Sequence, residues 1–292
     1  MSEKVEKSPS KTAEEVTLIR MGESQKGEDE RICYDPLAIH FISQKTLELH
    51  QKNPEIAKEK EVLFRGVANT IAARVRYFDD FVKKSIDEDI EQLVILGAGY
   101  DTRAYRIDGL KENVKVFEVD HPGTQGVKIE KLKELFGSLP DHVEYASVDF
   151  EEEILGENLF NRGYDPSKKT LFVMEGLTMY IPPEAVFEIL SFIVKDSGKG
   201  SAVIFDYGSR PANFEENPDR DVSENIRKSL EESGEHVKFG LMEGTVKKFL
   251  SERGFSNIVD VTSKDYKKAY FHGKNKDREV YSFISFAHAL VG

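Results

Sequence analysis

A pair of glycines directly after an apolar segment is the clearest sign of ligand binding in this chain. Residues 93–107 read LVILGAGYDTRAYRI, so an apolar strand runs straight into Gly97, Ala98 and Gly99. Glycines at such a turn let the backbone bend tightly and approach a ligand more closely than a side chain would allow. A turn packed only against protein would have the same sequence, because a lone Gly-x-Gly is weak evidence. The residues that follow favour a ligand.

Acidic residues follow the next expected strands. Asp120 ends the second strand, about 20 residues after the glycines, where an acid at a strand tip can accept both hydroxyls of a ribose. Thr102 occupies the position where a dinucleotide-binding fingerprint has its third glycine, so a nucleoside fits better than a diphosphate. Asp149 closes the third strand, where its carboxylate and the amide of Phe150 could meet an adenine edge. Glu175 comes just after the fourth strand.

These features share one edge of the expected sheet, since the carboxyl ends of parallel strands form the ligand crevice of open α/β sheets. Their summed charge is negative, which disfavours an anionic nucleotide and favours S-adenosylmethionine, with its ammonium and sulfonium groups. Any one of these acids could equally be a solvated strand end or a helix cap. Their joint placement indicates a site.

The elements that position these residues follow from hydrophobic patterning. Segments at 92–96, 170–174 and 202–205 are almost continuously apolar, as in strands covered by helices on both faces. The predicted strands are 92–96, 114–119, 142–148, 170–174, 201–207, 257–261 and a terminal, antiparallel one within 279–290. The predicted helices are 64–82, 123–136, 183–194, 222–232 and 242–253, with short ones around 36–50. The alternation predicts a doubly wound α/β fold.

Composition limits the partners. The 292 residues carry 53 acidic and 41 basic side chains, and the net charge of -12 argues against nucleic acid as a partner. Cys33 is the only cysteine, which points to a reducing, cytoplasmic location. No apolar run reaches the roughly 18 residues of a membrane helix, and no histidine spacing suits a metal. We therefore expect a soluble protein without a membrane partner, mobile at 1–12 and 22–31.

Seven segments together resemble the S-adenosylmethionine-dependent methyltransferases of the leucine carboxyl methyltransferase family, including its bacterial polyketide O-methyltransferase branch. The resemblance covers most of the chain. The segments are Arg20–Glu23, Asp35–Ala38, Ala73–Val75, Gly97–Arg103, Glu118–Asp120 with Pro122 and Lys128, Val148–Phe150, and Glu175–Tyr180. Phe150 departs from a common leucine, and residues 208–240 match nothing in the family pattern.

The resemblance implies a Rossmann-like class I methyltransferase fold with a mostly parallel, seven-stranded sheet. It implies a helical cap at 1–88 and a core at 89–292 that carries a lid insert at about 208–240. By the same resemblance, Arg74 would pair with the cofactor carboxylate, and Glu175 would face its amino-acid end. The cofactor-binding residues it implies are Arg74, Gly97, Ala98, Gly99, Asp120, Asp149, Phe150 and Glu175.

The implied activity is O-methylation of a carboxylate or hydroxyl on a small molecule or a peptide terminus. Tyr180 and Tyr207 follow strand ends and are candidates to lie near the acceptor, although each could be plain packing. A non-catalytic S-adenosylmethionine-binding protein on the same fold is the main alternative, and Thr102 disfavours a nicotinamide-dependent oxidoreductase. The acceptor, a catalytic residue and the oligomeric state stay open.

Overall fold

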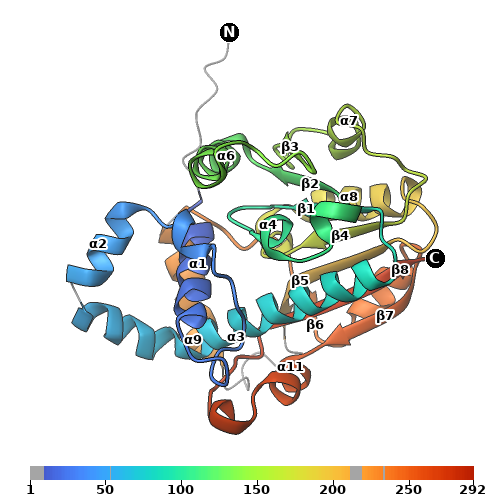
Figure 1. Ribbon diagram of the computed structural model, residues 1–292. Helices are drawn as coiled ribbons and strands as arrows, with labels where there is room; N and C mark the ends of the chain where they lie inside the picture. The colour runs from blue at the N-terminus through green and yellow to red at the C-terminus, as the bar shows by residue number, and fades with distance from the viewer. Residues whose placement is uncertain (1–9, 53, 211–218, 233) are drawn as a thin grey trace.

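The core of the molecule is a mostly parallel sheet, seen in a computed structural model that describes residues 10–52, 54–210, 219–232 and 234–292 (Figure 1). The strands within these ranges are β1 (Gln92–Leu96), β2 (Lys115–Asp120), β3 (Val143–Ser147), β4 (Thr170–Met174), β5 (Ala202–Arg210), β6 (Leu241–Met242), β7 (Phe255–Val261) and β8 (Ile284–Val291).

The strand order is β3-β2-β1-β4-β5-β8-β7, with the short β6 paired to the end of β5. Strands β1 to β5 are parallel, and β8 runs antiparallel to both β5 and β7. This confirms the predicted doubly wound α/β fold. It also confirms the terminal antiparallel strand, which begins at Ile284.

Helices cover both faces of the sheet, so every residue of β1 and β4 is buried. One face is covered by α3 (Pro54–Asp87), α4 (Arg103–Arg106), α5 (Leu110–Asn113) and α11 (Ser263–Tyr270). The other is covered by α7 (Leu155–Phe160), α8 (Pro183–Lys195) and α10 (Val246–Ser251). Helix α6 (Pro122–Phe136) packs beside β2 and β3. Two 3-10 turns, η2 (Thr178–Tyr180) and η4 (Gly273–Asn275), complete these layers.

Helix α3 contains the predicted helix at 64–82 and continues it in both directions. Ile71, Val75, Phe78 and Val82 recur at spacings of three or four and are buried against the sheet. The apolar periodicity therefore identified the buried face of this helix correctly.

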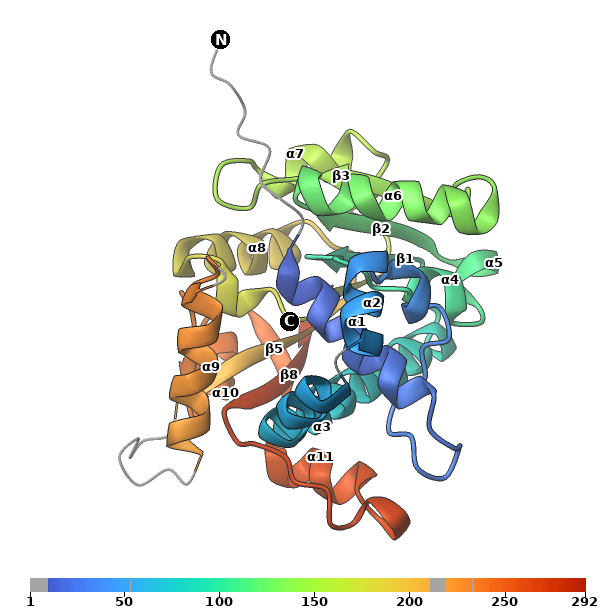
Figure 2. The same cartoon turned by 90° about the vertical axis from the view of Figure 1, so that its left-hand side faces the viewer.

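Helix α1 (Lys11–Ser24) was not predicted. Its buried side chains are the polar Thr17, Arg20 and Glu23, so it lacks the apolar stripe by which a helix is recognised. The expectation of mobile chain at 22–31 is wrong at its start, because Glu23 is 4% exposed and ion-paired to Arg278. Residues 1–9 lie outside the described residues. In Figure 2, α1 passes in front of the sheet, beside α9 (Arg220–Glu232).

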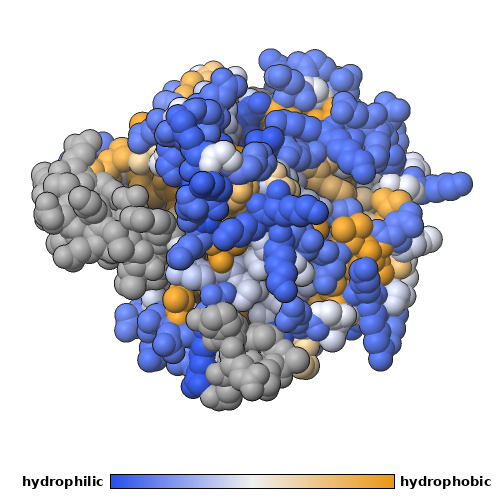
Figure 3. All heavy atoms as spheres, turned by 90° about the horizontal axis from the view of Figure 1, so that it is seen from below, coloured by the Kyte–Doolittle hydropathy of each residue, from blue (hydrophilic) through white to orange (hydrophobic). Residues whose placement is uncertain are grey.

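Short helices η1 (Ala38–Phe41) and α2 (Gln44–Lys52) follow α1, as predicted for 36–50. The predicted helix at 222–232 is α9, whereas the one at 242–253 is shorter because residues 241–242 form β6. No helix in the described ranges is long and apolar enough to cross a bilayer. Mainly hydrophilic side chains cover the face in Figure 3, with small apolar patches between them.

Candidate functional site at the strand tips

The glycine turn after β1 is fixed against β2 and β4. Gly97 and Gly99 have φ angles of +66° and +43°, in the left-handed region that favours glycine. A Cβ on Gly97 would lie 3.0 Å from Leu177, so a side chain at this position would collide. The amide of Ala98 donates to the carbonyl of Val119 at 3.0 Å. The two strand tips are thereby held side by side.

Asp120 ends β2 and contacts the same turn. Its Oδ2 accepts a hydrogen bond from the amide of Gly99, and its Oδ1 accepts one from the amide of His121 at 2.6 Å. Burial raises the pKa of the Asp120 carboxyl, and the two amides oppose this. Each carboxylate oxygen has two lone pairs, so both can still accept a hydroxyl.

Asp149 and Phe150 follow β3. The Oδ1 of Asp149 accepts from the amide of Glu151 at 3.1 Å, and His121 Nε2 lies 3.8 Å from its Oδ2. Phe150 is partly buried against the core on the α8 side of the sheet. The structure therefore brings the tips of β2 and β3 together through His121.

Arg74 and Glu175 meet at the tip of β4. Arg74 Nε lies 3.0 Å from Glu175 Oε1, and its Nη1 lies 2.7 Å from Asp206 Oδ2 on β5. Burial lowers the pKa of the Arg74 guanidinium, but the two carboxylates outweigh this, and the pKa is raised. The Nη2 of Arg74 has no hydrogen-bond partner within the described part of the chain. It lies beside Gly176, where an added Cβ would be 3.5 Å away.

Arg103, the last residue of the Asp-Thr-Arg segment, holds Glu175 from the other side. Its Nη1 lies 2.6 Å from Glu175 Oε2 and 2.5 Å from Asp101 Oδ2, and its Nε lies 2.7 Å from Asp79 Oδ1. Burial raises the pKa of Asp101, but the positive charges of Arg103 and Lys128 outweigh this and hold it at about 2. Both oxygens of Glu175 are therefore in ion-pair contact with guanidinium groups, although only Oε1 accepts a hydrogen bond within the described residues.

The ion pairs continue beyond Arg103. Arg106 forms a bidentate pair with Asp79 at 2.8 Å for each contact and lies 3.6 Å from Asp35. Arg20 of α1 lies 3.1 Å from Asp35. The resemblance included Arg20, Asp35 and Arg103 without roles, and sequence reasoning missed Asp79 and Arg106. The available signal was a charged residue within the apolar stripe of α3.

A separate buried pair lies behind Asp120. Lys128 Nζ is 2.7 Å from Glu118 Oε2, and both side chains are almost fully buried. Tyr105 donates to Glu118 Oε1 at 2.9 Å. These residues anchor α6 on β2, since Lys128 belongs to that helix and Glu118 to that strand.

The start of α1 and the segment after α9 contact the turns that follow β1 and β4. The Cβ of Ala13 lies 3.5 Å from where a Cβ on Gly99 would be. The hydroxyls of Ser10 and Thr12 donate to Glu235, with 3.1 Å between Ser10 Oγ and Glu235 Oε1. The amide of Lys238 donates to the carbonyl of Met179 at 2.7 Å. Two chain segments distant in sequence thus meet beside the glycine turn.

The two tyrosines that follow strand ends have different surroundings. Tyr207 is 1% exposed, and its hydroxyl donates a hydrogen bond to Asp260 Oδ1 on β7 at 2.7 Å. This tyrosine therefore has a structural role. Burial raises the pKa of Tyr180, and the carboxylate of Glu235 raises it further. Tyr180 therefore stays a candidate to lie near the acceptor.

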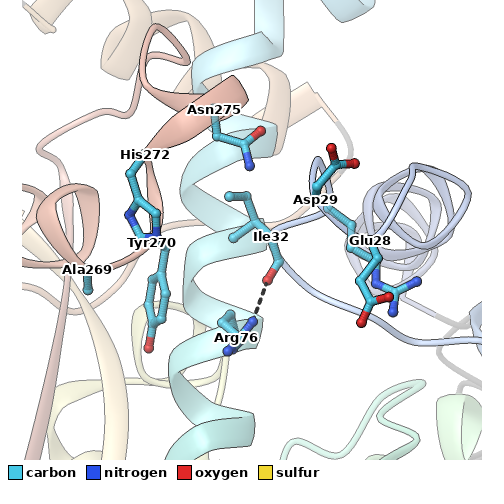
Figure 4. A pocket seen from close by; sticks show the side chains of 9 residues that line it. Glu28, Asp29, Ile32, Arg76, Ala269, Tyr270, His272 and Asn275 are labelled. Atoms are coloured by element: carbon cyan, nitrogen blue, oxygen red, sulfur yellow. Dashed lines mark hydrogen bonds between the residues drawn. The ribbon is translucent and has the colours of Figure 1, made fainter.

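Two cavities are formed by the described residues, and neither is lined by the glycine turn. A polar one of about 380 Å³ is bounded by Ile32, Arg76 of α3 and residues 269–275 (Figure 4). There Arg76 is held by both carboxylate oxygens of Asp80, at 2.9 and 3.0 Å. An apolar one of about 240 Å³ lies between α7 and α8 and extends to Phe150. Phe150 is the only predicted site residue that lines either of these two cavities.

The strand order, the glycine turn and the acid at the tip of β2 define a Rossmann-like methyltransferase core. The chain belongs to the leucine carboxyl methyltransferase family, whose model matches residues 13–194, more than half of its length.

The names of similar proteins agree with this family assignment. The chain is 27% identical over 252 residues to "Putative S-adenosyl-L-methionine-dependent methyltransferase YktD" of Bacillus subtilis (strain 168), covering 86% of this chain and 82% of that protein. A similarly named Mycobacterium marinum protein is 38% identical over 152 residues, 51% of this chain and 49% of that one. These names support the predicted cofactor. A DUF574 family protein from Streptomyces avermitilis shares the fold, with a TM-score of 0.59, 13% identity and 98% coverage of both chains.

Proposed function

We propose that this protein transfers the methyl group of S-adenosyl-L-methionine to an oxygen atom of a carboxylate or hydroxyl. The acceptor is a small molecule or a peptide terminus. The observation that carries the proposal is the position of Arg74. It is a buried guanidinium between the tip of β4 and Asp206 of β5, and its Nη2 group has no partner within the described chain.

Arg74 fits the cofactor carboxylate. Glu175 and Asp206 fix its orientation, and Gly176 leaves its Nη2 group uncrowded. A guanidinium held in this way loses little side-chain entropy when it binds a carboxylate. In this proposal Glu175 contributes its charge near the amino-acid end, because its oxygens are already engaged by Arg74 and Arg103.

The tips of β1, β2 and β3 fit the methionine arm, the ribose and the adenine of the cofactor. The backbone of Gly97, Ala98 and Gly99 would line the methionine arm. The free lone pairs of Asp120 would accept the ribose hydroxyls. Asp149 and Phe150 would flank the adenine, and the described contacts between the tips of β2 and β3 support this arrangement.

The bound cofactor supplies an electrophilic methyl group on its sulfonium. The chain aligns the acceptor and excludes water, a role that suits residues 1–88 as a helical cap and 208–240 as a lid. The contacts of Ser10 and Thr12 with Glu235 support this division. A carboxylate acceptor needs no base because it is already nucleophilic, whereas a hydroxyl must lose its proton. We assign no catalytic residue.

Incubation with methyl-labelled S-adenosyl-L-methionine and a panel of small carboxylates, phenols and peptides tests the proposal. We expect label in an ester or ether product and stoichiometric release of S-adenosylhomocysteine. Binding of the cofactor without turnover on any acceptor would instead favour the non-catalytic alternative. A protein that binds no cofactor would contradict both.

Asp120→Asn tests the placement of the cofactor. The amide nitrogen of Asn cannot accept a hydrogen bond, so we expect at least about tenfold weaker binding of S-adenosyl-L-methionine by calorimetry. Far-ultraviolet circular dichroism should be unchanged. The matched control is Asp108→Asn, at an exposed position, which should bind like the parent protein. Equal affinities in the two variants would refute the ribose assignment.

A further inference from the structure

One continuous series of buried ion pairs runs from α1 to Asp206 in the middle of β5. Each member lies within 4.0 Å of an opposite charge, and every side chain is at most 11% exposed. In the described residues the series contains four arginines and five carboxylates: Arg20, Asp35, Arg106, Asp79, Arg103, Asp101, Glu175, Arg74 and Asp206.

The series therefore has one more carboxylate than guanidinium groups. Both oxygens of Asp206 accept hydrogen bonds, from Arg74 Nη1 and from the amide of Gly176, each at 2.7 Å. Both oxygens of Glu175 face guanidinium nitrogens. Arg74 Nη1 and the amide of Gly176 oppose the rise that burial causes in the pKa of Asp206, and with every member ionised the series carries one excess negative charge. A net charge buried from water is costly, and a bound cation would offset that cost.

Glu175 is the member of the series best placed to act on a ligand. At 11% exposure it is the most accessible side chain of the series, and it follows β4 at the edge where the glycine turn lies. Its oxygens are engaged, so it would act on a ligand through its electric field. Such a field extends over several ångströms in a partly buried site.

We propose that Glu175 is a specificity determinant that favours the positively charged methyl donor over its demethylated product. S-adenosyl-L-methionine carries a sulfonium where S-adenosylhomocysteine carries a neutral thioether, and the two molecules are otherwise charged alike. The inference rests on the proposed function, because it places the cofactor at the strand tips. It goes further because it assigns to one carboxylate the preference for the methyl donor over the product, a preference that favours product release.

Titration calorimetry of both ligands on the parent protein and on Glu175→Gln tests the proposal. The substitution preserves shape and removes one negative charge. We expect the ratio of donor affinity to product affinity to fall by about tenfold, as for charges several ångströms apart at intermediate dielectric. A residue that only shapes the site would weaken both ligands equally, so an unchanged ratio overturns the proposal.

Two further variants make the result independent of folding defects. Asp206→Asn removes the same charge from the other side of Arg74 and should lower the ratio in the same direction. Asp35→Asn makes the same chemical change at the far end of the series and should leave the ratio within about twofold, because the field falls with distance. If Asp35→Asn lowers the ratio as much as Glu175→Gln, the proposal also fails. A parent protein that binds neither ligand contradicts the proposed function itself.

Discussion

At the scale of single residues, the site is organised by arginines that each hold more than one acid. Arg103 contacts Asp79, Asp101 and Glu175 and is 2% exposed. A guanidinium suits this position because its five N–H donors are fixed in a planar fork, whereas the ammonium of lysine is a compact charge on a flexible stem. The Asp-Thr-Arg segment after the glycine turn therefore fixes Glu175, one of the residues proposed to bind the cofactor.

Arg103→Met should lower the free energy of unfolding by about 3–5 kcal/mol, because it leaves buried carboxylates without their partner. The control is Arg76→Met on α3, where an exposed pair with Asp80 is removed, and the expected loss is below about 1 kcal/mol. Urea denaturation of both variants measures the difference. Similar losses would mean that the buried series contributes no more than a surface ion pair.

At the scale of elements, two segments that are more than 200 residues apart in sequence meet at the start of α1. Ser10 caps the N-terminus of α1 by accepting from the amide of Ala13 at 3.1 Å, and it also donates to Glu235. Thr12 contacts the same carboxylate. The segment after α9 and the first turn of α1 are thus joined through one side chain.

Glu235→Ala should loosen this contact. Loss of two hydrogen bonds, each contributing about 1 kcal/mol, should raise the amide exchange rate in the first turn of α1 by about tenfold or more. The melting temperature should change little. Glu231→Ala on α9, whose pair with Arg227 is exposed, serves as the control and should leave exchange in α1 unaltered. Equal exchange in both variants would show that Glu235 does not hold α1.

At the scale of the whole molecule, burial and neighbouring arginines shift the pKa values of the buried carboxyl groups in opposite directions. Burial raises the pKa of Asp79, but Arg106 and Arg103 outweigh it, so the pKa is lowered. Burial prevails at Asp206 and raises its pKa despite Arg74. These contributions to the pH dependence of stability oppose one another. The imidazole of His288 on β8 offers a simpler case, because burial and then Lys84 both lower its pKa, to about 4 from 6.5.

His288 should make stability fall as the pH is lowered from about 6.5 to about 4. The folded protein prefers the neutral ring, so its contribution is complete above the unfolded pKa and is lost as pH falls through the folded value. His288→Phe keeps an aromatic ring against Phe81, whose centroid lies 4.5 Å away. The urea midpoint of this variant should decline less over that range than the parent's. Parallel declines would contradict the assignment.

The sequence by itself determined the sheet and the edge at which the glycine turn and Asp120 meet. Apolar runs such as 92–96 and 170–174 predict strands buried on both faces, because continuous apolar patterning has no solvated side. The apolar stripe of α3 could also be recognised from the sequence, by its spacing of three and four residues. Glycines 97 and 99 predict the turn, since only they adopt its backbone angles easily.

Only the tertiary structure decided which charges meet. Arg20, Asp79, Arg103 and Glu175 are far apart in sequence, and each alone reads as a solvated side chain. Helix α1 escaped prediction for the same reason, since its buried face is polar and becomes stable only against partners from other elements. The local pattern of apolar residues indicates which apolar side chains are buried. Burial of a charge depends on an opposite charge that the fold brings to it.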